Sequence, residues 1–252
     1  MDRLPVSGAV VSLRLPTGAD DLLLLEQSGS DPEVALSLIS RLARTEPPVD
    51  WASLPVPDLE ALMLRIRQMA LGDRIQCDLR CRAPGCRARV DLSFSIDAYL
   101  EHRRPGARRG AVEPAEEPGW YRLRGEDIQF RLPRASDQIR GDGNPAELRT
   151  VCVRPAKSPA RLIRRVEAAL DAMAPILSGQ LDASCAECGR VTPVYFDVLG
   201  FVLAELRSEA AFIYEDVRTL AMKFHWQEPA ILEMPAKRRA RYVELAEESE
   251  RI

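Results

Sequence analysis

The sequence predicts an α+β protein built from two divergent copies of one unit, each a set of helices plus a zinc-ribbon-like β-hairpin, followed by a C-terminal helical extension. Three observations indicate this fold class. Apolar residues recur at helical spacing, short runs alternate like strands around two cysteine segments, and one order of motifs occurs twice. The expected boundaries are 1–104 for the first unit, 105–119 for a linker, 120–200 for the second unit and 201–252 for the extension.

The composition is that of an ordinary globular protein. The chain has 252 residues, of which 46% are hydrophobic and 29% charged, so it is long enough to bury a sizeable core. The formal net charge of -3 gives no bulk electrostatic reason to expect nucleic acid as a partner. No run approaches the ~20 apolar residues that span a bilayer, and no secretory signal is visible. We therefore expect a cytoplasmic protein of a bacterium or a phage-infected host cell, with no membrane partner.

The first unit is expected to begin with a strand and to continue with helices. The segment at 10–16 alternates like a strand. Asp31-Pro32 is a typical helix start, with the aspartate as N-cap and the proline at the first helical position. A hairpin and a short helix over 96–104 are expected to end the unit. Before them, a helix over 58–71 is predicted by apolar residues at helical spacing: Leu59, Leu62, Ile66 and Met69.

The second unit echoes the first. The letters LRLP at 13–16, with Asp20 four positions on, are answered by FRLP at 130–133, with Asp137 four positions on. A helix start with proline, an amphipathic helix and a second cysteine segment then follow in the same order. Divergent duplication explains this order, and chance is the alternative for so short a match. The extension has no counterpart and is expected to open with one long helix over 201–226.

Five of the six cysteines lie in two short segments that are typical of zinc knuckles. The segment CDLRCRAPGC holds Cys77, Cys81 and Cys86, and the segment CAECG holds Cys185 and Cys188. Zinc takes four ligands in a tetrahedron, with sulfur at about 2.3 Å. The metal ligands of one structural zinc ion that joins the two copies are therefore predicted to be Cys81, Cys86, Cys185 and Cys188, with Cys77 as a substitute ligand.

Other interpretations of the cysteines stay open. The two segments could be relics of a lost site or hold unpaired thiols, and Cys77 could be a core thiol. A redox pair at Cys185 and Cys188 would have to open a helix, whereas Gly189 and a strand-like run follow. Cys152 has no partner in sequence and is expected to be a small buried apolar side chain.

Nothing else in the sequence indicates an enzyme. The two histidines, His102 and His225, lie near no suitable nucleophile, and the sequence has no GxxxxGK[ST], GxSxG or HExxH motif. Basic residues cluster at 161–165 and 237–241, and both clusters are expected to be solvated helix faces. We predict no catalytic and no cofactor-binding residue.

A zinc-ribbon adaptor that binds nucleic acid or a transcription-type partner is the alternative function. It requires aromatic side chains interleaved with basic ones on the ribbon strands. The predicted strands offer Phe94, Tyr195 and Phe196, with arginines around the first cysteine segment. Acidic residues among them and the negative net charge weigh against this function.

Four stretches carry a resemblance to a known family: the opening LRLPTGADDLLLLE, the helix exit LGDRIQC with its cysteine segment, the segment CAECG, and the ending FIYEDVRTLAMKFHW with ILEMPAKRRARYVEL. Together they resemble the T-even phage baseplate family, which includes baseplate hub assembly chaperones and relatives in phage tails and phage-like contractile injection systems. The resemblance implies a non-enzymatic assembly chaperone or structural accessory protein. Its implied partners are baseplate or hub proteins of a contractile tail. The resemblance does not decide whether the cysteines bind metal.

Overall fold

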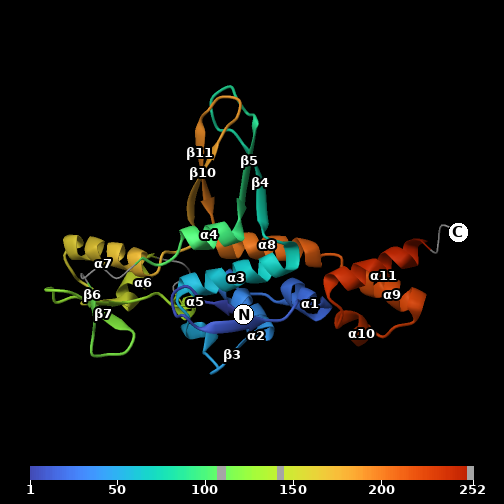
Figure 1. The fold of residues 1–252 in the computed structure, drawn as a ribbon, viewed down its shortest axis with the longest axis horizontal. Coiled ribbons are helices and arrows are strands. Elements are labelled where there is room, and N and C mark those ends of the chain that lie inside the picture. The colour runs from blue at the N-terminus through green and yellow to red at the C-terminus, as the bar shows by residue number, and fades with distance from the viewer. Residues whose placement is uncertain (107–111, 141–144, 249–252) are drawn as a thin grey trace.

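The computed structural model describes residues 1–106, 112–140 and 145–248. They form an elongated body of helices and small sheets, from which two β-hairpins project together on one side (Figure 1). We call these two hairpins the tower. This mixture of helices with small sheets confirms the predicted α+β class. In the described part of the chain, no helix is long and apolar enough to cross a membrane.

We call the two units predicted from the sequence the first copy and the second copy. The first copy runs from a small antiparallel sheet, through helices, to a hairpin and a short final helix. The sheet has the strand order β1-β2-β3, and β4 pairs with β5 along the first hairpin of the tower. The elements are β1 (Asp2–Arg3), β2 (Val10–Leu13), α1 (Gly18–Glu26), α2 (Asp31–Leu42), β3 (Ala43–Thr45), the 3-10 helix η1 (Trp51–Ser53), α3 (Val56–Leu71), β4 (Arg74–Arg80), β5 (Arg89–Ser95) and α4 (Ile96–His102).

The second copy repeats this order with a larger sheet, β6-β7-β8-β9, and with the second hairpin of the tower, β10-β11. Of the linker expected over 105–119, residues 107–111 lie outside the described residues, and the next three residues form the edge strand β6. The elements are β6 (Val112–Pro114), β7 (Trp120–Leu123), β8 (Gln129–Arg131), α5 (Ala135–Arg140), α6 (Pro145–Cys152), β9 (Val153–Arg154), α7 (Ala160–Met173), β10 (Gly179–Ser184), β11 (Val191–Phe196) and α8 (Val198–Ala210).

One arginine–aspartate ion pair, with a buried aspartate, occurs at the same place in both copies. Arg14 donates two hydrogen bonds to Asp20, at 2.7 and 2.9 Å. Arg131 donates two to Asp137, at 2.6 and 2.9 Å. Each aspartate also accepts the backbone amide three residues before it, at 2.9 Å in both copies, and so fixes the start of the helix that it belongs to. The repeated letters in the sequence therefore correspond to one repeated local structure.

The start of α2 differs from the expectation. Ser30, not Asp31, is the N-cap, because Ser30 has extended backbone and helical geometry begins one residue later. The Ser30 amide donates to the Glu33 carboxylate at 2.8 Å, which completes a capping box. Asp31 instead occupies the first turn, where its negative charge suits the helix dipole.

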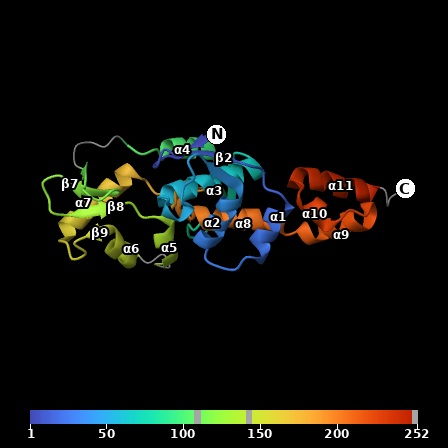
Figure 2. The same ribbon diagram turned by 90° about the horizontal axis from the view of Figure 1, so that it is seen from below.

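The largest hydrophobic core lies between helices of both copies. The first copy supplies side chains of α2 and α3, such as Leu38 and Leu62, and the second copy supplies Val202 and Leu203 from α8. These three helices pack side by side in the body (Figure 2). A smaller core around Phe130 lies in the second copy. The last helix of the second copy thus completes the core of the first.

Two helices occupy the segment that was expected to form one helix over 201–226. α8 ends at Ala210, and α9 (Ile213–Phe224) begins after a short turn. The expectation was wrong because both helices keep apolar residues at helical spacing, although α8 packs into the body and α9 packs into a separate core. With α10 (Glu228–Leu232) and α11 (Ala236–Glu248), α9 forms a C-terminal unit at one end of the body (Figure 1). Its core consists of Leu220, Ile231 and Met234.

Candidate metal centre

The tower consists of two antiparallel hairpins that stand side by side and carry the cysteine segments at their tips (Figure 1). The two hairpins are separate two-stranded sheets, with no ladder between them in the described residues. An isolated two-stranded hairpin is at best marginally stable in water. The tower therefore depends on contacts between the hairpins at its base and its tip.

Aromatic rings join the hairpins at the base. Phe94 of β5 and Phe196 of β11 meet edge to face, with ring centroids 5.5 Å apart, and both contact Tyr99 of α4. The nucleic-acid alternative needs aromatic side chains on the strand surface. Of the three named for it, only Tyr195 is free to stack on a base, being 72% exposed. The arrangement of these rings therefore does not favour that alternative.

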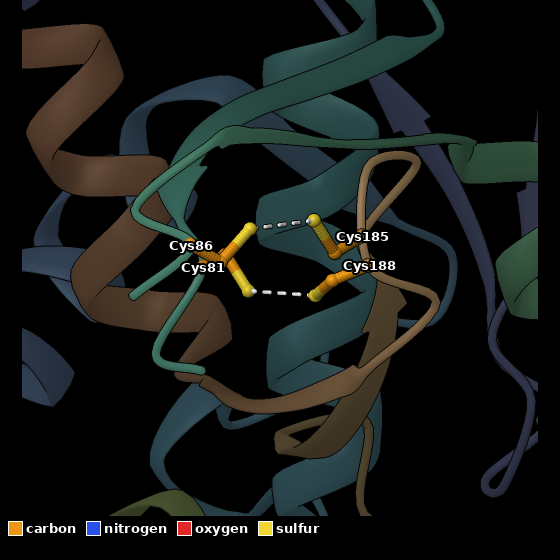
Figure 3. A group of neighbouring side chains, drawn as sticks. All are labelled: Cys81, Cys86, Cys185 and Cys188. Carbon is orange, nitrogen blue, oxygen red and sulfur yellow. Dashed lines mark hydrogen bonds between the residues drawn. The ribbon is translucent and has the colours of Figure 1, made fainter. Parts of the chain in front are cut away.

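Each tip folds into a tight turn whose sulfurs point toward the other hairpin (Figure 3). The Cys81 amide donates to the Ala88 carbonyl at 2.8 Å, and the Cys185 amide donates to the Arg190 carbonyl at 2.9 Å. Gly189 closes the second turn at φ 69°, a left-handed conformation that glycine adopts without strain. Both turns thus hold their first cysteine by the same type of backbone bond.

The structure brings four cysteine sulfurs together. The Sγ atoms of Cys81, Cys86, Cys185 and Cys188 all lie within 4.8 Å of one another. The Cys81–Cys188 separation is 3.6 Å, and the Cys86–Cys185 separation is 3.8 Å (Figure 3). Four sulfurs at about 2.3 Å from a zinc ion would lie about 3.8 Å apart, so these side chains fit a tetrahedral zinc ion. A disulfide requires about 2.05 Å, so the four are free thiols.

The crowded thiols have opposed protonation preferences. The backbone amides of Cys188 and Glu187 act with neighbouring sulfurs to lower the pKa of Cys185 to about 7, although burial opposes this. The backbone amide of Ala88 favours the Cys86 thiolate, but the neighbouring sulfurs and burial raise the pKa of Cys86 to about 12. A divalent cation would remove this conflict, because it binds and stabilises deprotonated thiolates.

The sulfur cluster is partly shielded from water. Cys81 and Cys185 are 4% and 2% exposed, with Val90 and Ala183 packed beside them, whereas Cys188 is exposed. Among the described residues, no histidine or carboxylate completes the group with these sulfurs. A metal held by four cysteines has no open position for water or substrate, which is the arrangement of structural zinc sites.

The two remaining cysteines lie elsewhere. Cys77, the predicted substitute ligand, is in the middle of β4, half-buried against the main core and outside the sulfur cluster. Burial raises the pKa of its thiol. Cys152 is only 2% exposed, and burial raises its pKa to about 11. Cys152 is therefore the buried side chain that the sequence predicted.

Sequence reasoning missed the buried charged side chains of α3. Glu60 accepts hydrogen bonds from the Leu177 amide at 2.7 Å and from the Ser178 hydroxyl at 2.6 Å, just before the second hairpin. Arg67 donates to Glu205 of α8 at 2.8 Å. The apolar stripe of α3 predicted the helix but gave no sign that its polar positions are also covered.

Arg239 corrects the expectation of a solvated face over 237–241. Its side chain is 3% exposed and donates to Asp21 at 2.6 Å and to Asp216 at 2.8 Å. It thus joins α11 to α1 and to α9. The sequence could not single it out, because the neighbouring Arg241 in the same basic run is exposed.

Comparison with known families matches residues 1–155 to the family described as T4 bacteriophage base plate protein. The match covers more than half of the 252-residue chain. The chain belongs to this family. The predicted resemblance is therefore confirmed, and the baseplate family supports a structural role in a phage baseplate. Searches of curated proteins and of solved structures find no match to this baseplate protein. The matched range contains the first cysteine segment and ends before the second.

Proposed function

We propose that this baseplate protein is a non-enzymatic assembly chaperone or structural accessory of the baseplate or hub of a contractile, phage-tail-like particle. We also propose that a structural zinc ion, held by Cys81, Cys86, Cys185 and Cys188, ties the two halves of its tower together. Other baseplate or hub proteins are its partners. Membership of the baseplate family supports a role in such a particle, and the four converging sulfurs support the binding of a metal ion.

The convergence of one cysteine pair from each copy is the observation that carries this proposal. The two pairs lie far apart in the sequence: Cys86 and Cys185 are 99 residues apart, and Cys81 and Cys188 are 107 residues apart. No ladder joins their hairpins in the described residues, so the tips meet only through the sulfur cluster and the apolar side chains packed beside it, such as Val90 and Ala183. A zinc ion bound there would act as a cross-link and would supply folding free energy.

The position of the tower suits a protein that presents a rigid surface to a partner. The tower projects from the body (Figure 1). The turns at its tip carry exposed arginines that form no ion pair within the described residues: Arg82, Arg87 and Arg190. A cross-linked tip keeps these side chains in one arrangement. An assembly factor needs such a fixed surface, because ordering a flexible surface on binding costs free energy.

Assembly in cells that produce the particle tests the proposal. We expect a strain carrying Cys185→Ser to yield fewer complete baseplates in sedimentation and electron microscopy than one carrying Cys77→Ser, which removes a thiol outside the cluster. Protein mass spectrometry of finished particles separates the two roles, because an accessory stays in the particle and a chaperone leaves. Normal baseplates in a strain that lacks the protein would contradict the function. Normal baseplates with Cys185→Ser would contradict the role of the sulfur cluster.

A further inference from the structure

Two helices of the body begin at a shared joint. The amide of Val56, the first residue of α3, donates to the Pro133 carbonyl at 3.0 Å. The amide of Ala135, the first residue of α5, donates to the Leu54 carbonyl at 2.9 Å. The first amides of a helix have no partner within the helix, so this reciprocal pairing satisfies one orphan amide on each side.

A second joint of this kind fixes the C-terminal unit to α1. Gly18, the first residue of α1, donates its amide to the Met234 carbonyl at 3.2 Å, and Thr17 pairs with Pro235 as an isolated antiparallel bridge. In both joints a strand–helix corner (16–18 or 133–135) meets a pre-helix segment that contains proline (54–56 or 234–236). The two corners are equivalent, since each follows the arginine and precedes the aspartate of the repeated ion pair.

The second copy has a third pre-helix segment, 158–160, which is free. Pro159 precedes α7 with φ -56° and ψ 142°, and Pro55 precedes α3 with φ -55° and ψ 142°. Pro159 and Ala160 are exposed. Within the described residues, neither the Ala160 amide nor the Ser158 carbonyl has a backbone partner. The proline of this segment therefore has the backbone conformation of Pro55 in the docked segment 54–56, but no strand–helix corner of the described residues pairs with it.

The charges around the free segment indicate what would dock there. Lys157 and Arg164 are exposed and form no ion pair in the described part of the chain, so this end of α7 is basic. In the C-terminal joint, the corner contributes Asp21 from the first turn of its helix, and that aspartate pairs with Arg239 of the docked helix. A corner whose helix opens with acidic residues would complement the basic end of α7 in the same way.

We propose that residues 158–160 are the docking edge for a strand–helix corner of another baseplate protein, a corner whose helix has an acidic first turn. Another molecule of this protein is not the expected occupant, because both of its described strand–helix corners are already paired with its own pre-helix segments. The C-terminal unit closes one end of the row of joints, as capping repeats do in repeat proteins. The helix α7, which begins in the segment 158–160, lies at the opposite end of the body (Figure 2).

In-cell cross-linking of the full-length chain tests this docking edge. A photoreactive amino acid at the exposed Ala156, which leaves Lys157 and Arg164 in place, is combined with Ala160→Pro, which removes the amide donor at a helix position where proline is favoured. Residue 159 already has the extended backbone that a following proline requires. The matched control is Glu228→Pro, which removes the first amide of α10, an exposed helix start of another kind. Equal melting temperatures of the purified variants would show that both fold.

We expect an adduct in particle-producing cells whose peptide, identified by mass spectrometry, is a strand–helix corner of another baseplate protein. Ala160→Pro should lower the adduct yield about tenfold, the effect of leaving one interface carbonyl unpaired, and Glu228→Pro should not. An unchanged yield with Ala160→Pro would overturn the proposal. An adduct with another molecule of this same protein would also overturn it. The absence of any adduct, when the protein is present in baseplate assemblies, would overturn it as well. None of these outcomes depends on zinc.

Discussion

Asp137 and Arg131 form an ion pair that is almost completely shielded from water, with side chains 3% and 10% exposed. A buried charge is costly unless it has both a charged partner and hydrogen bonds, and this pair has both. Asp20 and Arg14 form the corresponding pair in the first copy, where Asp20 is buried but the Arg14 side chain is 44% exposed. The repeated letters were visible in the sequence. Their role was not, because the arginine lies at a strand end and the aspartate in the following helix.

Asp137→Asn is expected to lower the free energy of unfolding by about 3 kcal/mol, because it leaves the Arg131 guanidinium buried without its charge partner. Urea unfolding of the purified protein measures this change. Asp91→Asn is the control, since Asp91 is 72% exposed where it pairs with Arg89 and should contribute less than about 1 kcal/mol. Equal effects of the two substitutions would contradict the importance assigned to the buried pair.

The same pair predicts a pH dependence. Burial acts to raise the pKa of Asp137, but the hydrogen bonds from Arg131 and from the Arg134 amide outweigh it, so the pKa lies below its ordinary value. A carboxyl group with a lowered folded pKa stabilises the protein above its unfolded pKa, about 4, and this stabilisation is lost as the pH falls through the folded pKa.

The destabilisation caused by Asp137→Asn should therefore be largest near neutral pH and should shrink as the pH drops below about 4. Unfolding curves of wild type and variant at several pH values measure the difference directly. Burial also acts to raise the pKa of Asp20, but the hydrogen bonds from Arg14 and the Thr17 amide and the charge of Arg41 outweigh it, so the pKa is lowered. The destabilisation caused by Asp20→Asn should therefore show the same trend with pH. A difference that stays constant down to low pH would show that the charge of the carboxylate is not what stabilises the fold.

At the scale of elements, α3 connects the two copies. Its first amide lies in the joint with α5, Glu60 holds the segment before β10, and Arg67 binds Glu205 of α8. The apolar periodicity of the sequence was sufficient to predict this helix. The contacts of Glu60 and Arg67 could not be predicted, because their partners lie more than a hundred residues away and periodicity reports only on one helix.

Glu60→Ala should release the base of the second hairpin. It leaves the buried Leu177 amide without an acceptor, which costs about 2 kcal/mol, and it should speed hydrogen exchange at Leu177 and Ser178. Glu60→Gln is the matched control, since it keeps an acceptor oxygen. Burial is the largest influence on Glu60 and raises its pKa despite the bonds from Ser178 and Leu177, so loss of the charge alone should cost little. Unchanged exchange in Glu60→Ala would contradict the role of this contact.

At the scale of the whole molecule, the sequence predicted the α+β class, the family and the two cysteine segments that the fold brings together. These features depend on local patterns: short alternating runs, helical periodicity and cysteine spacing. The sequence did not predict that α8 completes the core of the first copy, nor that the corners and pre-helix segments form joints. Both depend on contacts between distant segments, and the backbone bonds of a joint leave no mark on residue type.

The zinc content of the purified full-length protein tests most directly whether a metal at the sulfur cluster joins the two copies. Elemental analysis measures the zinc, and thiol titration before and after a chelator measures the thiols that the metal protects. We expect about one zinc ion per chain and four thiols that become reactive only after chelation, contributed by the clustered cysteines. Cys77→Ser should keep the zinc, and Cys185→Ser should lose it. A metal-free chain in which the clustered thiols react without a chelator would contradict the zinc cross-link and leave the tower tips joined by packing alone.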